Sequence, residues 1–450
     1  MVEQRRVVII GAGVAGLAAA ARLGEAGFSV VIWEARDRIG GRVFTHHDSA
    51  ADSPIELGAE FIHGLAPEIW EPLHEQGAEV VEVEGQSWCV TPQGLARCKF
   101  FRRVDKILGK MDDSLPDEPF LSFLNREFPN AEREPQLEEA KRHTLSYVSG
   151  FNAADPDLVG VHWLVQGMRA EEKIEGHRAF RSHHGYDDLL NAFRQRIGRC
   201  DVKICTNTVV EQIKWRPGQA EIFARNEKGA VVLSAARVLM TLPVAILKAS
   251  PGELGSVEFI PELPSEKIAS FEKIETGKVV RIVLRFRERL WERVSATDDP
   301  GKSLADMSFL FSQDETFPTW WTAMPKKLPI ITGWAPFGSA ERMTGLDVDG
   351  VTAEALHALE HSLGIGLEDL KSCLERAYFH DWQADPFARG AYTYGKVGSD
   401  GAQKALGAPV ANTLFFAGEA TDVTANNGTV HGAIASGYRA AREIVYAARR

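Results

Sequence analysis

The stretch Val7-Val8-Ile9-Ile10-Gly11-Ala12-Gly13-Val14-Ala15-Gly16 decides the fold. Four consecutive β-branched residues predict a strand that is buried on both faces, as in a parallel sheet. The glycines that follow have distinct roles in a strand–turn–helix unit. Gly11 permits a tight turn, Gly13 lets a pyrophosphate approach the backbone, and Gly16 allows the helix to pack closely on the strand. The stretch therefore predicts a dinucleotide-binding turn.

The residues downstream fit the same unit. A helix is expected over Leu17–Ala26, and a second strand over Ser29–Trp33 ends at Glu34. An acidic residue at this point hydrogen-bonds ribose hydroxyls, and its charge disfavours a 2′-phosphate, so NADP is not expected. The alternative is a glycine-rich turn that binds no ligand. Arg5-Arg6 before the apolar run also permits a twin-arginine export signal; we favour the strand, and with it an unprocessed cytoplasmic protein.

Composition restricts the classes of partner. The chain has 51 Lys and Arg against 62 Asp and Glu, a net charge of −11, which disfavours nucleic acid as a partner. No uncharged apolar run reaches the roughly 18 residues of a membrane-spanning helix, so no membrane span is expected. The five cysteines include no CxxC pair, which predicts reduced thiols and no structural zinc or other metal. Oligomeric state is not readable.

The chain organisation predicts a split nucleotide-binding unit of the α/β class. Residues 100–199 have helical spacing, and short strands return over 202–205, 209–215, 220–224, 238–240 and 279–286. A buried strand is expected over 414–417 and a last helix over 432–448. We expect a Rossmann-type domain of residues 1–85, 200–255 and 405–450. An inserted substrate-binding domain of mixed α+β structure would span residues 86–199 and 256–404.

A second glycine cluster separates this chain from a simple NAD dehydrogenase. Gly40-Gly41-Arg42 follows Arg36 and suits another close approach to phosphate oxygens, with Arg42 as a charged donor. Further motif segments are Gly58-Ala59-Glu60-Phe61-Ile62-His63-Gly64, Thr241-Leu242-Pro243, Phe416-Ala417-Gly418-Glu419-Ala420-Thr421 and Gly428-Thr429-Val430-His431-Gly432. Taken in this order over nearly the whole chain, these segments resemble the flavin-containing amine oxidases.

The resemblance implies FAD as the cofactor. Family members with a covalent flavin attach it through a cysteine just before the tyrosine that Tyr392 matches; that position is Ala391 here, so non-covalent binding is expected. The residues that the resemblance and the fingerprint assign to the cofactor are Gly11, Gly13, Gly16, Glu34, Arg36, Gly41, Arg42, Gly58, Ala59, Val210, Gly418, Glu419, Thr429 and Val430.

The resemblance also implies an activity. A primary or secondary amine, with polyamines ranked first, would lose a hydride to flavin N5, and the imine would hydrolyse to an aldehyde. Molecular oxygen would be reduced to hydrogen peroxide. The alternative within the fold is an FAD-dependent L-amino-acid oxidase or desaturase, although no arginine is evidently placed for a substrate carboxylate. A flavoprotein scaffold or demethylase-like chromatin partner is the rival from another class.

Several aromatic residues are candidates for the substrate site. Tyr392 matches a ring that family members place beside the flavin, but the opposing position is Thr429, which leaves a two-ring cage incomplete. At His63 the chain resembles polyamine and spermine oxidases, and this resemblance implies a residue that senses or orients a distal amine. Tyr392 and His63 also admit purely structural readings. Other candidate lining residues are Phe61, Trp320 and Trp334, with Phe151 and Tyr186 as further ones.

The last candidates concern the reaction with oxygen. Arg281 stands where many members of the resembled family have a lysine near flavin N5, and Gly277 matches a glycine at the same offset. Lys278 is the competing candidate, but its odd offset on a strand turns it to the opposite face. Arg281 would order a water and stabilise developing negative charge. The alternative is a structural ion pair.

Overall fold

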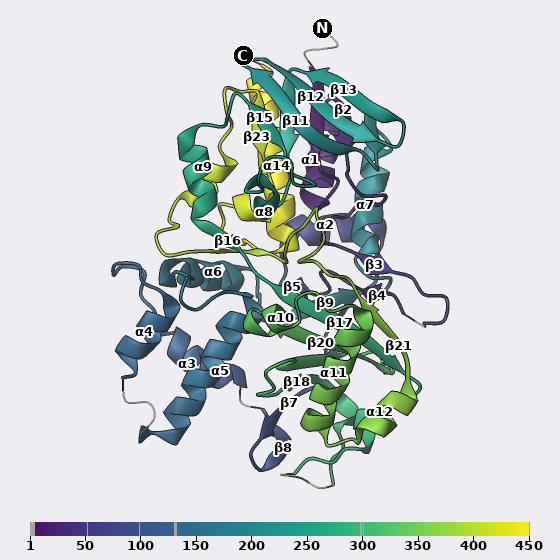
Figure 1. The fold of residues 1–450 in the computed structure, drawn as a ribbon, viewed down its shortest axis with the longest axis vertical. Helices are drawn as coiled ribbons and strands as arrows, with labels where there is room; N and C mark the ends of the chain where they lie inside the picture. Colours follow the sequence, from purple (N-terminus) through teal and green to yellow (C-terminus); the bar gives the residue numbers. More distant parts are fainter. Residues whose placement is uncertain are drawn as a thin grey trace.

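The computed structural model describes residues 5–51, 53–98, 100–129, 133–297, 299 and 301–449. It contains a nucleotide-type sheet at one end, near both chain termini, and a larger mixed sheet at the other (Figure 1). The predicted domain ranges also include residues 1–4, 52, 99, 130–132, 298, 300 and 450. These residues lie outside the described part.

The first sheet is the one that the opening stretch predicts. Five parallel strands lie in the order β10-β2-β1-β14-β23. Their bounds are β1 Arg6–Ile10, β2 Ser29–Trp33, β10 Val202–Cys205, β14 Arg237–Met240 and β23 Leu414–Phe416. The Rossmann-type α/β class is therefore confirmed.

Helices cover one face of this sheet. Helix α1 (Val14–Glu25) and the last helix, α14 (Val430–Ala447), cross so closely that a Cβ on Gly437 would lie 2.3 Å from the Ala15 carbonyl oxygen. Helices α2 (Pro67–Gln76) and α7 (Asp187–Ile197) bury apolar side chains in the same core.

The other face is covered by a four-stranded sheet. Its strands are β11 (Val209–Arg216), β12 (Gln219–Asn226), β13 (Gly229–Ala235) and β15 (Glu258–Ile260). Strand β13 was not predicted, since its residues alternate between exposed and half-buried and include glycine and serine.

The second lobe is built on a seven-stranded sheet in the order β21-β17-β20-β19-β18-β7-β8. All neighbours are antiparallel except β18 and β7. The bounds are β7 Gln86–Thr91, β8 Gly94–Arg97, β17 Val279–Phe286, β18 Met307–Phe311, β19 Thr319–Thr322, β20 Ile330–Pro336 and β21 Leu374–Phe379.

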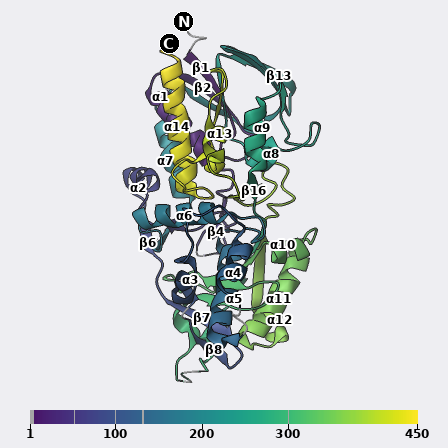
Figure 2. The ribbon, with the colours of Figure 1, turned by 90° about the vertical axis from the view of Figure 1, so that its left-hand side faces the viewer.

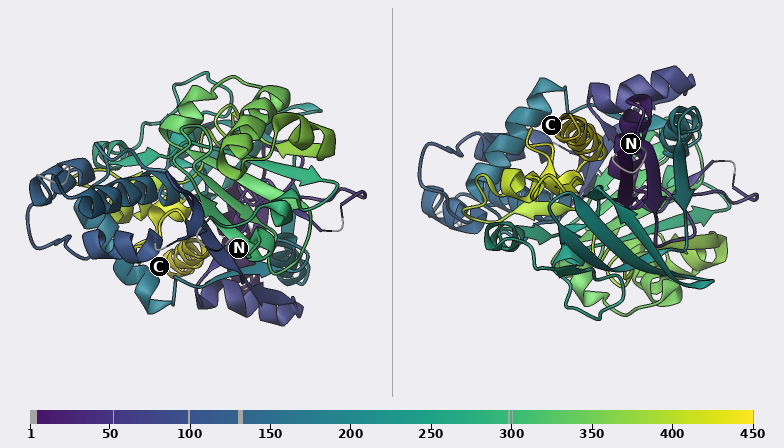
Figure 3. Two further views of the ribbon diagram at one scale, coloured as in Figure 1. Left: turned by 90° about the horizontal axis from the view of Figure 1, so that it is seen from below. Right: turned by 90° about the horizontal axis from the view of Figure 1, so that it is seen from above.

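Two groups of helices belong to this lobe, and the view from below separates them (Figure 3, left). The green helices α11 (Val348–Leu363) and α12 (Leu367–Cys373) pack on one face of the sheet. The blue helices share a separate core. They are α3 Phe100–Leu108, α4 Phe120–Glu127, α5 Pro135–Phe151 and α6 Val161–Lys173. In Figure 2, α3, α4 and α5 are at the same end of the molecule as the green helices.

The remaining helices and strands are shorter. The helices are α8 Val244–Leu247, α9 Ser265–Glu272, α10 Gly338–Arg342 and α13 Ala402–Gly407; the strands are β3 Thr45–His46, β4 Ile55–Glu56, β5 Ile62–His63, β6 Val80–Glu82, β9 Ala179–Ser182, β16 Ile274–Thr276 and β22 Thr393–Gly395. Helices α7 and α9 fall inside the predicted substrate domain but pack against the nucleotide-type sheet side. The proposed domain boundaries stay a prediction.

One expectation about the cysteines is wrong. Cys89 and Cys98 are joined in a disulfide, with their Cα atoms 5.1 Å apart. The β7–β8 hairpin brings together two residues whose spacing shows no CxxC signature, so counting cysteines did not reveal the pair. Cys200, Cys205 and Cys373 are free. Within the described ranges, no helix is long and apolar enough to cross a membrane, and no cluster of three metal-ligating side chains occurs.

Candidate active site

A single cavity of about 1980 Å³ connects the glycine turn after β1 with the seven-stranded sheet. It is large enough for an extended dinucleotide together with a small substrate. The predicted cofactor residues that line it are Gly11, Gly13, Glu34, Arg36, Gly41, Arg42, Gly58, Ala59, Val210, Gly418, Glu419, Thr429 and Val430. Gly16 does not line it.

The glycine turn has the geometry that a bound pyrophosphate requires. Gly11 has φ +101°, a conformation that favours glycine. A Cβ on Gly41 would lie 3.2 Å from the Cα of Gly13, so the two glycine loops lie against each other. A Cβ on Gly16 would lie 2.1 Å from the Gly11 carbonyl oxygen, and this residue therefore serves helix–strand packing.

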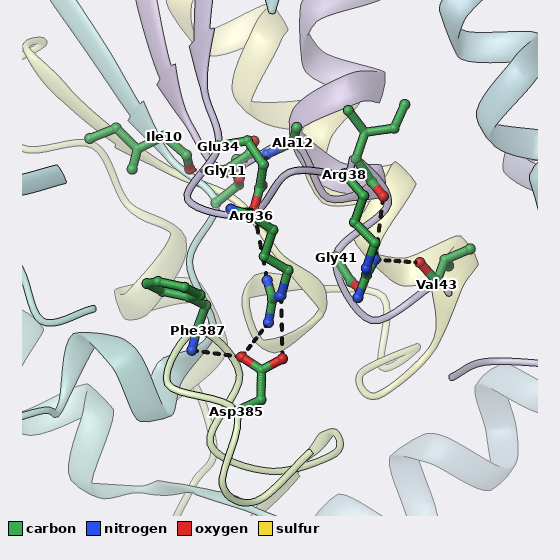
Figure 4. Close-up of polar contacts among 12 residues, drawn as sticks. Ile10, Gly11, Ala12, Glu34, Arg36, Arg38, Gly41, Val43, Asp385 and Phe387 are labelled. Atoms are coloured by element: carbon green, nitrogen blue, oxygen red, sulfur yellow. Dashed lines mark hydrogen bonds and ion pairs between the residues drawn. The ribbon is translucent and has the colours of Figure 1, made fainter. Parts of the chain in front are cut away.

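Glu34 is buried at the end of β2 and holds the turn together (Figure 4). One carboxylate oxygen accepts a hydrogen bond from the Ala12 N–H at 2.7 Å, and the other accepts from the Arg36 N–H at 3.0 Å. A carboxylate oxygen has two lone-pair directions, so each one keeps an acceptor site for a ligand hydroxyl.

The Arg36 guanidinium is engaged by the protein itself. Nη2 lies 2.7 Å from one carboxylate oxygen of Asp385, and Nε donates to the other at 3.3 Å (Figure 4). Burial would raise the pKa of Asp385, but hydrogen bonds from His380 and Arg36 hold it well below its ordinary value. Arg36 therefore fixes the loop that contains Asp385 and Phe387, a role that the sequence did not indicate.

The C-terminal motif closes the cofactor end of the cavity. Glu419 is buried, and one carboxylate oxygen accepts from Thr393 Oγ1 at 2.6 Å and from the Gly428 N–H at 2.9 Å. Its other oxygen accepts from Arg42 at 2.9 Å. Thr429 caps α14 by accepting a hydrogen bond from the Gly432 N–H. The N-terminal turn of this helix lines the cavity, where its dipole favours negative charge.

A charged cluster lies on the wall that β17, β19 and β9 form at the other end. Arg281 is only 5% exposed; its Nη1 donates to the Gly58 carbonyl at 2.7 Å, and its Nη2 pairs with Glu60. Glu60 also accepts from Arg181 at 2.7 Å and from Trp321 Nε1 at 2.9 Å. Burial would raise the pKa of Glu60, but the two arginines hold it below its ordinary value.

Two of the predicted catalytic and substrate-binding residues lie outside the cavity. Lys278 precedes β17, is half exposed and pairs with Glu341 at 2.8 Å. Trp320 is fully buried in the core beneath α11, because successive side chains of β19 point to opposite faces of the sheet. Its neighbour Trp321 lines the cavity in its place.

The remaining substrate candidates line the cavity together. The Tyr392 hydroxyl donates to the Phe151 carbonyl at 2.6 Å, and the Phe151 and His63 ring centroids are 5.6 Å apart. Burial lowers the pKa of His63 to about 4, so its imidazole is neutral at ordinary pH. The other predicted residues that line the cavity are Phe61, Tyr186, Trp334 and Thr429.

Sequence reasoning missed Glu60 and Arg181 as members of the site. Glu60 lies inside the Gly58–Gly64 motif. Successive side chains of an extended segment point to opposite sides, and this difference between Glu60 and Phe61 is the only signal that could have singled out Glu60. Arg181 comes from β9, a segment that no motif marks, and its position depends on strand pairing with β5 and β6.

Comparisons with known proteins place these features in a family context. The family model described as flavin containing amine oxidoreductase matches residues 14–445. Polyamine oxidase 3 of Oryza sativa subsp. japonica is 26% identical over 464 residues, covering 97% of this chain and 88% of the relative. Lysine-specific histone demethylase 1 homolog 1 of the same organism is 28% identical over 472 residues, covering 99% and 52%.

Solved structures share the fold. Wild-type putrescine oxidase bound to putrescine has a TM-score of 0.76 at 22% identity, covering 98% of this chain and 99% of that one. Cyclohexylamine oxidase from Brevibacterium oxydans IH-35A has a TM-score of 0.78 at 19% identity, covering 99% of both chains.

Proposed function

The chain belongs to the flavin-containing amine oxidoreductases, and within this family we propose that it oxidises a primary or secondary amine, with polyamines as the first substrate class. FAD is its cofactor, and FAD supplies the acceptor for the two electrons and the hydrogen that leave the substrate. The glycine turn, Glu34 and the N-terminal turn of α14 are the groups that would hold it.

The observation that most supports an amine over an amino acid concerns the arginines at the inner end of the cavity. A substrate carboxylate needs a free guanidinium, yet Arg281 and Arg181 both pair with Glu60. Glu60 neutralises one of the two positive charges. Neither guanidinium is free to bind a substrate carboxylate, and the rings of Tyr392, Phe61 and Trp321 that line the cavity suit the alkyl chain of a neutral amine.

The residues around the chamber position the substrate rather than exchange protons with it. Tyr392 and Phe61 present rings to an alkylamine, and the neutral imidazole of His63 is able to hydrogen-bond without repelling a cation. The reacting nitrogen must be neutral for its carbon to lose hydride. A chamber that excludes water favours that state, because burial disfavours the ammonium form.

The overall reaction balances with oxygen and water. A primary amine loses hydride and a proton to become an imine, and water converts the imine to an aldehyde and ammonia. Oxygen takes up the two electrons and two protons and becomes hydrogen peroxide. Support for this assignment comes from the family match and from relatives described as polyamine oxidases.

The test is peroxide release by the FAD-loaded enzyme on a panel of polyamines, diamines, monoamines and L-amino acids, with a substrate-free control. Peroxide with amines and none with amino acids supports the proposal. Activity confined to amino acids would assign the alternative of an L-amino-acid oxidase.

A further inference from the structure

Glu171 lines the same cavity as the glycine turn and is not part of any motif. It belongs to the last turn of α6 and is half-buried. Within the described part of the chain, its carboxylate has no hydrogen bond and no salt bridge. Burial alone raises its pKa to about 7. An unpaired carboxylate in such surroundings gains most from a cationic ligand.

The aromatic rings of Phe151 and Tyr147 line the cavity between Tyr392 and this carboxylate. Tyr392 is hydrogen-bonded to the Phe151 carbonyl at 2.6 Å. The Phe151 ring is stacked on Tyr147, one turn earlier in α5, with centroids 5.3 Å apart and planes within 6°. The pKa of Tyr147 is raised by burial and by the nearby charge of Glu171. Tyr392, Phe151, Tyr147 and Glu171 all line the cavity, and these contacts and charge interactions make them neighbours.

Other carboxylates of the cavity have protein partners or are exposed. Glu60 pairs with two arginines, and Glu82 pairs with Arg178 at 2.7 Å. Glu172 follows Glu171 on the same helix but is exposed to solvent. Glu171 is thus a half-buried carboxylate with no protein cation assigned to it.

We propose that Glu171 binds the distal ammonium group of a diamine or polyamine whose reacting nitrogen lies beside Tyr392. The inference rests on the proposed function and adds a second recognition point to it. The methylene chain between the two nitrogens would lie along Phe151 and Tyr147, whose ring faces favour alkyl groups and cations. The separation of the two points then selects the chain length of the substrate.

The first experiment compares matched substrates on the FAD-loaded enzyme without oxygen. Stopped-flow absorbance records flavin reduction by two matched pairs of amines. In the first pair putrescine is compared with butylamine, and in the second hexane diamine is compared with hexylamine. The wild type favours at least one diamine over its monoamine. Glu171→Gln weakens the apparent binding of that diamine by about tenfold or more and changes the monoamine little. An unchanged preference for the diamine in Glu171→Gln would overturn the proposal.

Two further variants make the result specific. Glu172→Gln removes the same charge one residue away and is expected to change the diamine preference by less than about twofold. Glu171→Asp keeps the charge on a shorter side chain, so the preference persists and moves toward a longer diamine. Equal losses in Glu171→Gln and Glu172→Gln would indicate general electrostatic attraction and would also overturn the assignment. Flavin content and melting temperature confirm that each variant is folded.

A binding measurement separates this inference from the proposed function. Calorimetry compares the affinities of hexamethonium, which has two charged ends, and hexyltrimethylammonium, which has one. The difference gives the contribution of the second charge to binding without turnover. If no amine reduces the flavin, the proposed function fails. Tighter binding of hexamethonium that disappears in Glu171→Gln still supports the subsite, and equal binding of both probes by the wild type overturns it.

Discussion

Arg281 Nη1 donates to the carbonyl oxygen of Gly58 at 2.7 Å, which joins the first half of β17 to the loop that begins the Gly58–Gly64 motif. The same guanidinium pairs with Glu60 in that motif. Arg281 is therefore both a structural ion pair and a permanent positive charge on the cavity wall. The structure confirms the ion pair, and the role of Arg281 in the reaction with oxygen stays a prediction.

The first prediction concerns reaction with oxygen. Arg281→Met slows flavin reoxidation much more than flavin reduction by amine, because it removes a charge that stabilises developing anions while the aromatic rings that line the cavity stay in place. Stopped-flow measurement of the two half-reactions checks this.

Lys278→Met is the matched control. Lys278 lies outside the cavity and pairs with Glu341 on the surface, so neither half-reaction changes much. Normal reoxidation in Arg281→Met, or a large loss in Lys278→Met, would contradict the role given to Arg281.

The second prediction concerns cofactor retention. Glu34→Ala removes the acceptor for the Ala12 and Arg36 N–H groups and for a ribose hydroxyl, at a cost on the order of 1.5–3 kcal/mol per charged hydrogen bond. The variant loses FAD on dialysis, and Glu34→Asp loses less. The ratio of flavin to protein absorbance measures the loss. A full complement of FAD in Glu34→Ala would refute the assignment.

The third prediction uses a buried carboxyl that the mechanism does not involve. Burial raises the pKa of Glu56 to about 8, while its two oxygens accept from Thr45 Oγ1 and the Tyr186 N–H. The unfolded chain releases this proton near the ordinary pKa, but the folded chain keeps it until about pH 8. The stability that Glu56 contributes is therefore lost as the pH rises through this interval.

Glu56→Gln cannot ionise and is close to Glu56 in shape. Its free energy of unfolding exceeds that of the wild type at about pH 9 and differs little at about pH 5. Urea unfolding in the presence of excess FAD measures the free energy of unfolding of the variant and of the wild type at each pH. A difference independent of pH would show that Glu56 does not titrate in this way.

The fourth prediction concerns the attachment of FAD. Position 391 is alanine, and Cys89, which lines the cavity, is in a disulfide. Acid or heat denaturation therefore releases all of the yellow chromophore into the supernatant. Flavin absorbance that stayed with the precipitate would reveal a covalent link.

The parts of this protein that the sequence predicts are those that local patterns encode. The run Val7–Ile10 and the glycines after it specify β1, the turn and α1, and the structure confirms them, with α1 beginning at Val14 rather than at Leu17. The strand Val279–Phe286 has the predicted bounds, and its alternation places Arg281 on the cavity side.

The parts that the sequence did not predict depend on long-range pairing. The partners of Glu60 come from β9, β17 and β19, which are far apart in the chain and meet only in the folded lobe. Trp320 and Trp321 are adjacent in sequence, and only the register of β19 decides which of them faces the cavity. The Cys89–Cys98 disulfide likewise depends on a hairpin.

The most direct test of the account is anaerobic mixing of the FAD-loaded protein with polyamines, diamines and monoamines, followed by admission of oxygen. The account predicts that an amine bleaches the oxidised flavin, that oxygen restores its colour, and that one peroxide appears for each amine consumed. Flavin that no amine reduces, while an L-amino acid does, would contradict it.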